Sequence, residues 1–372
     1  MPALRDTFLC ACCGGRYLTM VRRQVGEVEI CEGCESAETV ACSQCGSRIW
    51  RSDNAGDESL PLCRDCFQQR YTTCIYCHRP VSNRDARYEE DDEDEEYPYC
   101  RDCFSRRSES IHDYCYKPSP IFYGEGNRFL GVELEIDGGG ELGYKALQLM
   151  NAGNRNGREH IYCKHDGSLN KGIEIVSHPM TLAYHTEHMP WSDVISAARE
   201  MGYTSHKAGT CGLHVHVSRS AFGATEGKQD ACIARILYFF EKHWEELLKF
   251  SRRTQTQLNQ WAARYGYKTE PREILDHAKE YRSRNRYTCV NLTNAATIEF
   301  RMFRGTLNLN SFLATLQFVD LICDVAKNMT DEQVKEMSWT TFASGCDSPE
   351  LIQYLKERRL YVNEPVKSEV EV

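Results

Sequence analysis

The sequence predicts an α+β protein with an antiparallel sheet, preceded by small metal-binding modules. Cysteines paired as CxxC crowd the first third of the chain. Four later segments alternate apolar and polar residues, as half-buried strands do. Long helical patterns separate these strands, without the regular alternation that builds a parallel sheet. The length of 372 residues leaves room for two or three domains.

The CxxC pairs repeat along the chain. Cys10, Cys42 and Cys74 are 32 residues apart, and the spacing inside a module is CxxC-x17-CxxC twice and CxxC-x22-CxxC once. We therefore predict three modules in residues 1–104, at about 8–36, 40–68 and 72–105. Their paired cysteines are Cys10, Cys13, Cys31, Cys34, Cys42, Cys45, Cys63, Cys66, Cys74, Cys77, Cys100 and Cys103.

Four thiolates at this spacing predict one tetrahedral zinc ion per module, and the array resembles zinc-ribbon or treble-clef modules. A four-cysteine site has no open coordination position, so these three zinc ions are expected to be structural. The start of the chain lacks the pattern of a secretory signal peptide. We therefore expect a reducing, cytoplasmic setting, in which metal sites are favoured over disulfides. Cys12 and Cys115 are left over as thiols.

The charge of the chain says little about its partners. The formal net charge is −9, but the run Glu89–Glu96 alone carries eight negative charges. We expect that run to be a solvated, extended loop. Basic residues are scattered over the zinc array without a clear stripe, which leaves open a nucleic-acid or a protein partner. No run of 18 uncharged apolar residues occurs, so we expect no membrane-spanning helix and no membrane partner.

After the zinc array the sequence predicts a linker at 105–127, a larger domain at 128–330 and a carboxy-terminal helix and tail at 331–372. Strands are expected at 129–137, 171–179, 212–218 and 296–303. Helical periodicity predicts helices at 142–150, 191–201, 228–250, 271–282, 309–329 and 348–359.

The four strands share an unusual polar face. Their alternation places on it Glu133, Glu135, Glu174, His214, His216, Glu299, Arg301 and Phe303. A solvent-facing sheet surface ordinarily carries Thr, Lys, Ser and Gln instead. Carboxylates two residues apart on one strand face repel each other, and a divalent cation removes that repulsion. The residues therefore predict a site for Mg²⁺ or Mn²⁺ and a polyphosphate.

Four segments resemble the putative amidoligase family, a branch of the glutamine-synthetase-like carboxylate–amine ligases. They are "GVELE", "HDGSLNKGIEIVSHP", "KAGTCGLHVHVS" and "NLTNAATIEFRMFRGTLN", spread over about 129–328. The resemblance implies a curved antiparallel sheet of glutamine-synthetase-like type that forms a funnel. It also implies an ATP-dependent reaction, in which a carboxylate becomes an acyl phosphate and an amine displaces the phosphate.

The resemblance also implies roles for single residues. Metal ligation is expected of Glu133, Glu135, Glu174, His214 and Glu299, and contact with the phosphates of Arg301. Residues expected to line the nucleotide or substrate pocket, or to reach a phosphate, are Lys207, His216, Ser218, Arg286, Arg304 and, by proximity to the motif, Asn291. Ala208 follows Lys207 where glutamine synthetase has proline, and loops guarding an ammonia site have no counterpart. The expected amine is therefore an amino-containing metabolite, a peptide or a protein.

Two other functions stay open on the sequence. One is a non-catalytic adaptor, in which the zinc array binds protein or nucleic acid and the ligase domain is degenerate. The other is a metal-dependent hydrolase that uses His214 and His216. The hydrolase leaves the arginine-bearing strand without a role, and the adaptor leaves the intact acidic residues without one.

Overall fold

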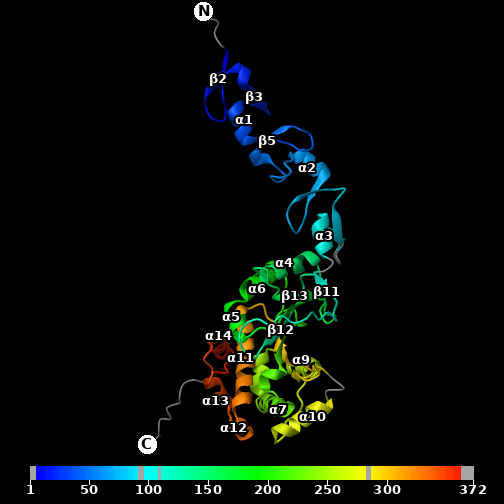
Figure 1. Ribbon diagram of the computed structural model, residues 1–372, viewed down its shortest axis with the longest axis vertical. Coiled ribbons are helices and arrows are strands. Elements are labelled where there is room, and N and C mark those ends of the chain that lie inside the picture. Colours follow the sequence, from blue (N-terminus) through cyan, green and yellow to red (C-terminus); the bar gives the residue numbers. More distant parts are fainter. Residues whose placement is uncertain (1–5, 91–95, 108–109, 282–285, 362–372) are drawn as a thin grey trace, which may run out of the picture. The chain divides into compact units, whose positions relative to one another are not determined.

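The computed structural model describes residues 6–90, 96–107, 110–281 and 286–361. The chain divides into two compact units, Met1–Glu109 and Ser110–Val372 (Figure 1).

The first unit repeats one pattern of a short hairpin followed by a helix. The first module holds β1 (Thr7–Leu9), β2 (Arg16–Leu18), the 3₁₀ turn η1 (Thr19–Val21), β3 (Arg22–Val25), β4 (Val28–Cys31) and α1 (Glu32–Glu38). The second holds β5 (Thr39–Ala41), β6 (Arg48–Trp50), η2 (Arg51–Asp53) and α2 (Arg64–Arg70). The third holds β7 (Tyr71–Thr73), β8 (Pro80–Ser82), β9 (Arg87–Glu90), β10 (Glu96–Tyr99) and α3 (Arg101–Arg107). Each module therefore consists of short antiparallel strands and one short helix.

In every module the first CxxC pair lies in the hairpin turn. The residue after its second cysteine has a positive φ, at Gly14 (70°), Gly46 (77°) and His78 (58°). Its amide donates a hydrogen bond to the carbonyl of the first cysteine, as from Gly14 to Cys10 at 2.9 Å. This left-handed turn suits glycine and brings the two sulfurs of the pair to one side.

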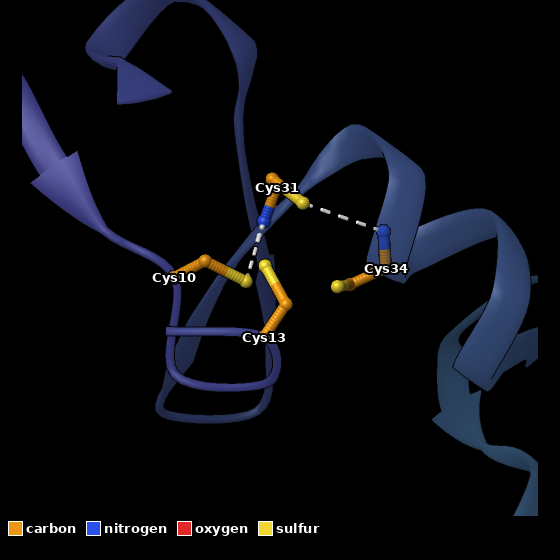
Figure 2. A group of neighbouring side chains, drawn as sticks. All are labelled: Cys10, Cys13, Cys31 and Cys34. Atoms are coloured by element: carbon orange, nitrogen blue, oxygen red, sulfur yellow. Dashed lines mark hydrogen bonds between the residues drawn. The ribbon is translucent and has the colours of Figure 1, made fainter. Parts of the chain in front are cut away.

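The second CxxC pair begins the helix, which completes a four-sulfur group. Figure 2 shows the first such group, where the amide of Cys34 donates to Cys31 Sγ at 3.5 Å and that of Cys31 to Cys10 Sγ at 3.3 Å. In each module the four sulfurs lie within 4.8 Å of one another. Tetrahedral zinc with Zn–S bonds of about 2.3 Å separates its sulfurs by roughly 3.8 Å. The structure thus supports three zinc-binding modules.

The ends of the acidic run differ from the expected solvated loop. Glu89 and Glu96 belong to β9 and β10, which pair antiparallel. Glu89 accepts a hydrogen bond from Tyr99 and lies 2.9 Å from the guanidinium of Arg107. The middle of the run, 91–95, lies outside the described residues.

A seven-stranded sheet organises the second unit. Its strands are β11 (Ile111–His112), β12 (Leu130–Ile136), β13 (Ile161–Lys164), β14 (Ile173–Ser177), β15 (Gly212–Ser218), β16 (Val290–Asn291) and β17 (Thr297–Arg304), in the order β11-β13-β14-β12-β15-β17-β16. Five of the six pairings are antiparallel, as predicted, but β11 and β13 are parallel, so the sheet is mixed. β11 lies in the stretch where a linker is expected.

One face of the sheet is buried beneath helices. These include α4 (Gly143–Gly153), α5 (Leu182–Glu187), α6 (Trp191–Glu200), α7 (Glu226–Lys242), α8 (Trp244–Ser251) and α11 (Leu309–Asn328). Phe300 packs on Phe240 of α7, and Phe303 packs on Phe250 of α8 and Phe318 of α11. The helices α12 (Asp331–Glu336), α13 (Trp339–Ser344) and α14 (Pro349–Glu357) add buried residues to the same core. Further helices are η3 (Arg219–Phe222), α9 (Gln255–Trp261) and α10 (Pro271–Tyr281).

Two details differ from the sequence-based expectations. The helix expected at 228–250 ends at Lys242, and α8 starts afresh after His243, whose side chain is buried against the carbonyl of Met337. A register shift between β15 and β17 also changes the predicted alternation, because it turns Phe303 into the core beside Met302. A β-bulge of this kind alters which face successive side chains occupy.

The helix α11 is long and apolar enough to cross a membrane, and it is the one such helix in the described part of the chain. Two thirds of its most apolar stretch, 67%, is buried inside the second unit. Its apolar surface therefore packs in the protein core.

His185 gives the second unit a pH-dependent stability. Its Nδ1 accepts a hydrogen bond from the Trp191 indole at 3.1 Å, and its Nε2 donates to the carbonyl of Leu130 at 3.0 Å. Burial lowers the pKa of His185 from 6.5 to about 4, although the hydrogen bond to Leu130 raises it by a smaller amount. The unfolded chain therefore binds a proton that the folded one excludes, and stability is lost as pH falls from 6.5 to 4, by about 3 kcal/mol.

Urea unfolding at pH 7.5 and pH 4.5 tests this expectation. His185→Gln should show a smaller loss of stability on acidification than the wild type, and His165→Gln, at an exposed histidine, should match the wild type. Equal acid sensitivity of His185→Gln and wild type would contradict the assignment.

Candidate active site

The strand register brings the predicted polar residues together on the face opposite the core. Glu133 lies across from His214, and His216 lies across from Glu299. Glu135 lies across from Glu174 on the other side of β12. The central strands β14, β12, β15 and β17 therefore each contribute to one patch. Its members Glu133, Glu174, His214, His216 and Glu299 are here called the acid–histidine cluster.

Distances inside the acid–histidine cluster are those of direct contact. Glu133 Oε2 lies 3.4 Å from His214 Nδ1, and Glu133 Oε1 lies 3.2 Å from His216 Nε2. Glu299 Oε1 lies 3.8 Å from His214 Nδ1. Two triads can each hold a metal ion, because ligand atoms within each lie within 4.8 Å of one another. They are Glu133, His216, Glu299 and Glu133, Glu174, His214.

Charge and burial shift the pKa values of the cluster. Burial alone would raise the pKa of Glu133, but His216 and His214 outweigh it and hold it well below the usual value. Burial lowers the pKa of His216, but attraction to Glu133 and Glu299 raises it overall. Burial, followed by repulsion from Glu133, raises the pKa of Glu174 well above the usual value despite Lys164. A divalent cation here would favour the ionised form of Glu174.

Neighbouring groups orient the cluster. Asn291 of β16 donates to Glu299 Oε2 at 2.8 Å, and Arg301 forms an ion pair with Glu299 Oε1. Lys164 Nζ lies 3.3 Å from Glu174 Oε2. These contacts hold the carboxylates in place, as hydrogen bonds to the ligands do in metal sites. Carboxylates with two imidazoles are a donor set that fits Mn²⁺ as well as Mg²⁺.

Glu135 is held differently from Glu133. It is 5% exposed and accepts a hydrogen bond from the backbone amide of Gly212. Its Oε1 lies 3.7 Å from His214 Nε2, on the other edge of the ring from Glu133. His214 thus lies between Glu133 and Glu135 of β12.

Three adjoining cavities surround the cluster. The acid chamber, about 480 Å³, contains the five cluster residues together with Lys164, Asp166, Asn291 and Arg301. The apolar cleft, about 460 Å³, borders it at Glu133 and His216 and is walled by residues such as Tyr116, Pro118, Pro120, Tyr162 and Ala295. The arginine–aromatic chamber, about 460 Å³, shares His214, Arg301, Arg286, Asp166 and Tyr114 with the acid chamber and adds Arg253, Trp261 and Tyr287.

Some predicted pocket residues lie elsewhere. Arg304 and Lys207 neighbour His206, whose pKa is lowered by burial and then by these cations together with Arg252 and Arg358. They line none of the three cavities, and neither does Ser218 at the end of β15. Arg286 does line two of them.

Two further residues of the site, Arg253 and Lys164, are not indicated by the sequence. Arg253 follows α8, a place where an arginine ordinarily serves the helix dipole, yet it lines the arginine–aromatic chamber. The left-handed conformation of Arg252 (φ 60°) ends α8 immediately before it. Lys164 belongs to β13, a four-residue strand with no clear alternation. Lys164 is the register partner of Glu174, which places it at the cluster. This pairing depends on two strands and cannot be inferred from the sequence of one strand alone.

Comparison with known proteins adds an independent finding. The family described as "putative amidoligase enzyme" matches residues 152–323, which includes β13 to β17 but begins after β12. A bifunctional glutathione synthetase from Pasteurella multocida shares 13% identity and a TM-score of 0.34, over 62% of this chain and 46% of that chain. The chain thus spans under half of that enzyme's length, and the similarity is too low to transfer structural detail. No curated protein matches the chain. Through residues 152–323 the second unit matches the putative amidoligase family, as its motifs predicted.

Proposed function

We propose that this protein is an ATP-dependent carboxylate–amine ligase with a glutamine-synthetase-like catalytic sheet. The family match supports an amide-bond-forming ligase in general. The observation that carries the finer proposal is the acid–histidine cluster, which combines buried carboxylates with Arg301 at one edge. Cation ligands beside an arginine are what phosphoryl transfer to a carboxylate requires.

The reaction would proceed in two steps. A carboxylate oxygen of the acid attacks the γ-phosphorus of ATP, ADP leaves, and an acyl phosphate forms. An amine then attacks the acyl carbon, phosphate leaves, and the amine gives up a proton as the amide forms.

The chain's own residues have distinct tasks in this scheme. The carboxylates of Glu133, Glu174 and Glu299 with His214 would hold Mg²⁺ or Mn²⁺, which neutralises phosphate charge when bound. Arg301 would donate to the transferring phosphoryl group, since its Nε is buried without a hydrogen-bond partner. The apolar cleft beyond His216 would receive the nucleotide base.

The zinc array has a separate role in this proposal. Its three modules would dock a macromolecular substrate or a protein or nucleic-acid partner, because closed four-cysteine sites supply no catalytic position.

An assay with pooled substrates tests the ligase. The zinc-loaded protein is incubated with ATP, Mg²⁺, a pool of carboxylic acids and a pool of amines. We expect phosphate release that depends on both pools and matches the amide formed. Phosphate release that needs neither pool, or amide cleavage without ATP as in a hydrolase, would contradict the proposal.

A further inference from the structure

We propose that the arginine–aromatic chamber binds the acid substrate. The substrate's carboxylate, such as that at the end of a peptide, would be attached to an aromatic or other planar group. The identification of this ligand as the acid substrate rests on the proposed ligase function. The binding itself rests on Arg253, Arg301 and the aromatic walls.

Two arginines of the chamber, Arg253 and Arg301, have buried donors without a hydrogen-bond partner. The donor is the Nε atom in each of them. Arg253 donates from Nη2 to the carbonyl of Phe303 at 3.3 Å, and Arg301 uses Nη1 on Glu299. Buried polar groups are ordinarily paired, so two guanidinium groups with unused donors point to a ligand that accepts hydrogen bonds.

Electrostatics select an anion for this place. Burial, joined by repulsion from Arg301 and Arg304, lowers the pKa of Arg253 to about 10, against attraction to Glu135. A carboxylate between Arg253 and Arg301 would relieve this repulsion and accept charge-assisted hydrogen bonds.

Local packing holds Arg253 next to the reaction centre. A side-chain carbon at Gly212 would lie 2.7 Å from Arg253 Nη2 and 2.6 Å from His214 Nε2. The absence of a side chain at Gly212 therefore lets the guanidinium lie beside His214. A carboxylate bound there would be adjacent to the acid–histidine cluster.

The walls suit a flat group. Trp261 and Tyr287 meet edge to face with ring centres 5.5 Å apart. Arg286 lies against the rings of Tyr114 and Tyr287, at 5.6 Å and 5.1 Å from their centres. Rings and guanidinium planes of this kind stack on planar groups.

Calorimetric titration of the full-length, zinc-loaded protein tests the inference without ATP. The probes are N-acetyltryptophan, its amide and N-acetylalanine. We expect N-acetyltryptophan to bind at least tenfold more tightly than either of the other two. Arg253→Gln should lose the preference for the acid over the amide, and Trp261→Leu should lose the preference for tryptophan over alanine.

Arg252→Gln is the matched control, because Arg252 is the adjacent half-buried arginine but contacts Arg304 and Tyr354 outside the chamber. It should bind all three probes as the wild type does. Equal binding of acid and amide by the wild type, or wild-type binding by Arg253→Gln, would overturn the inference. If Arg253→Gln does not fold, unchanged selectivity in the partly exposed Trp261→Leu would still overturn it.

The outcome is separable from that of the ligase proposal. Selective binding without any ATP-dependent turnover would support the binding site in the chamber and contradict the ligase proposal. Turnover that is indifferent to the shape of the acid, with no selective binding, would remove the inference alone.

Discussion

Removal of zinc is expected to unfold the first unit while the second unit remains folded. The first module's core consists of few buried residues, among them Phe8, Val25 and Ile30. So small a core cannot offset the loss of chain entropy, and structural zinc contributes on the order of 10 kcal/mol to the folding of such modules. The second unit has its own large core. Metal analysis should give about three zinc ions per chain, and hydrogen exchange after chelation should show loss of protection confined to residues 6–107.

Two variants, each with a single cysteine replaced, sharpen this test. Cys34→Ser removes one of the four sulfurs in Figure 2 and should leave about two zinc ions per chain. Cys12→Ser changes an exposed cysteine of the same module, outside the four-sulfur group, and should leave about three. One zinc or none in the wild type would contradict the three-module account.

Replacement of Glu299 by glutamine is expected to weaken divalent-cation binding in the acid chamber strongly. Glu299 is 3% exposed and belongs to a metal-competent triad with Glu133 and His216. The amide keeps nearly the same shape but removes one negative charge, so Arg301 and His216 are left with less compensation. Mn²⁺ binding, followed by electron paramagnetic resonance on the zinc-loaded protein, should weaken at least 100-fold, and ATP-dependent turnover should fall at least as far.

The matched control is Glu141→Gln. Glu141 also pairs with a histidine, His165, at 3.0 Å, but both side chains are about 40% exposed and stand outside the cluster. It should bind Mn²⁺ as the wild type does. Unchanged Mn²⁺ affinity in Glu299→Gln would contradict the site.

The sequence predicted well what depends on simple periods. Cysteine spacing of 32 residues predicted the three modules, and alternation in four strands predicted that Glu133, Glu174, His214 and Glu299 share one face. The strand register then brought His216 into the cluster, although the sequence-based assignment placed it in the pocket. Roles of single residues in this set stay predictions until tested.

Tertiary features limited the rest of the prediction. A register shift moved Phe303 to the core, and Arg253, just after the left-handed turn at Arg252, lines a cavity. Lys207 and Arg304 belong to the motifs, but they lie near His206 and line none of the three cavities. None of these positions is encoded by a hydrophobic period, since each depends on where distant segments meet.

Oxygen transfer tests the acyl-phosphate chemistry most directly. An acid that supports turnover is labelled with ¹⁸O in its carboxylate and incubated with ATP, an amine and the zinc-loaded protein. If the carboxylate attacks the γ-phosphorus, one carboxylate oxygen leaves with each phosphate, and the released phosphate carries one ¹⁸O per amide formed. Amide formation with unlabelled phosphate would contradict the account.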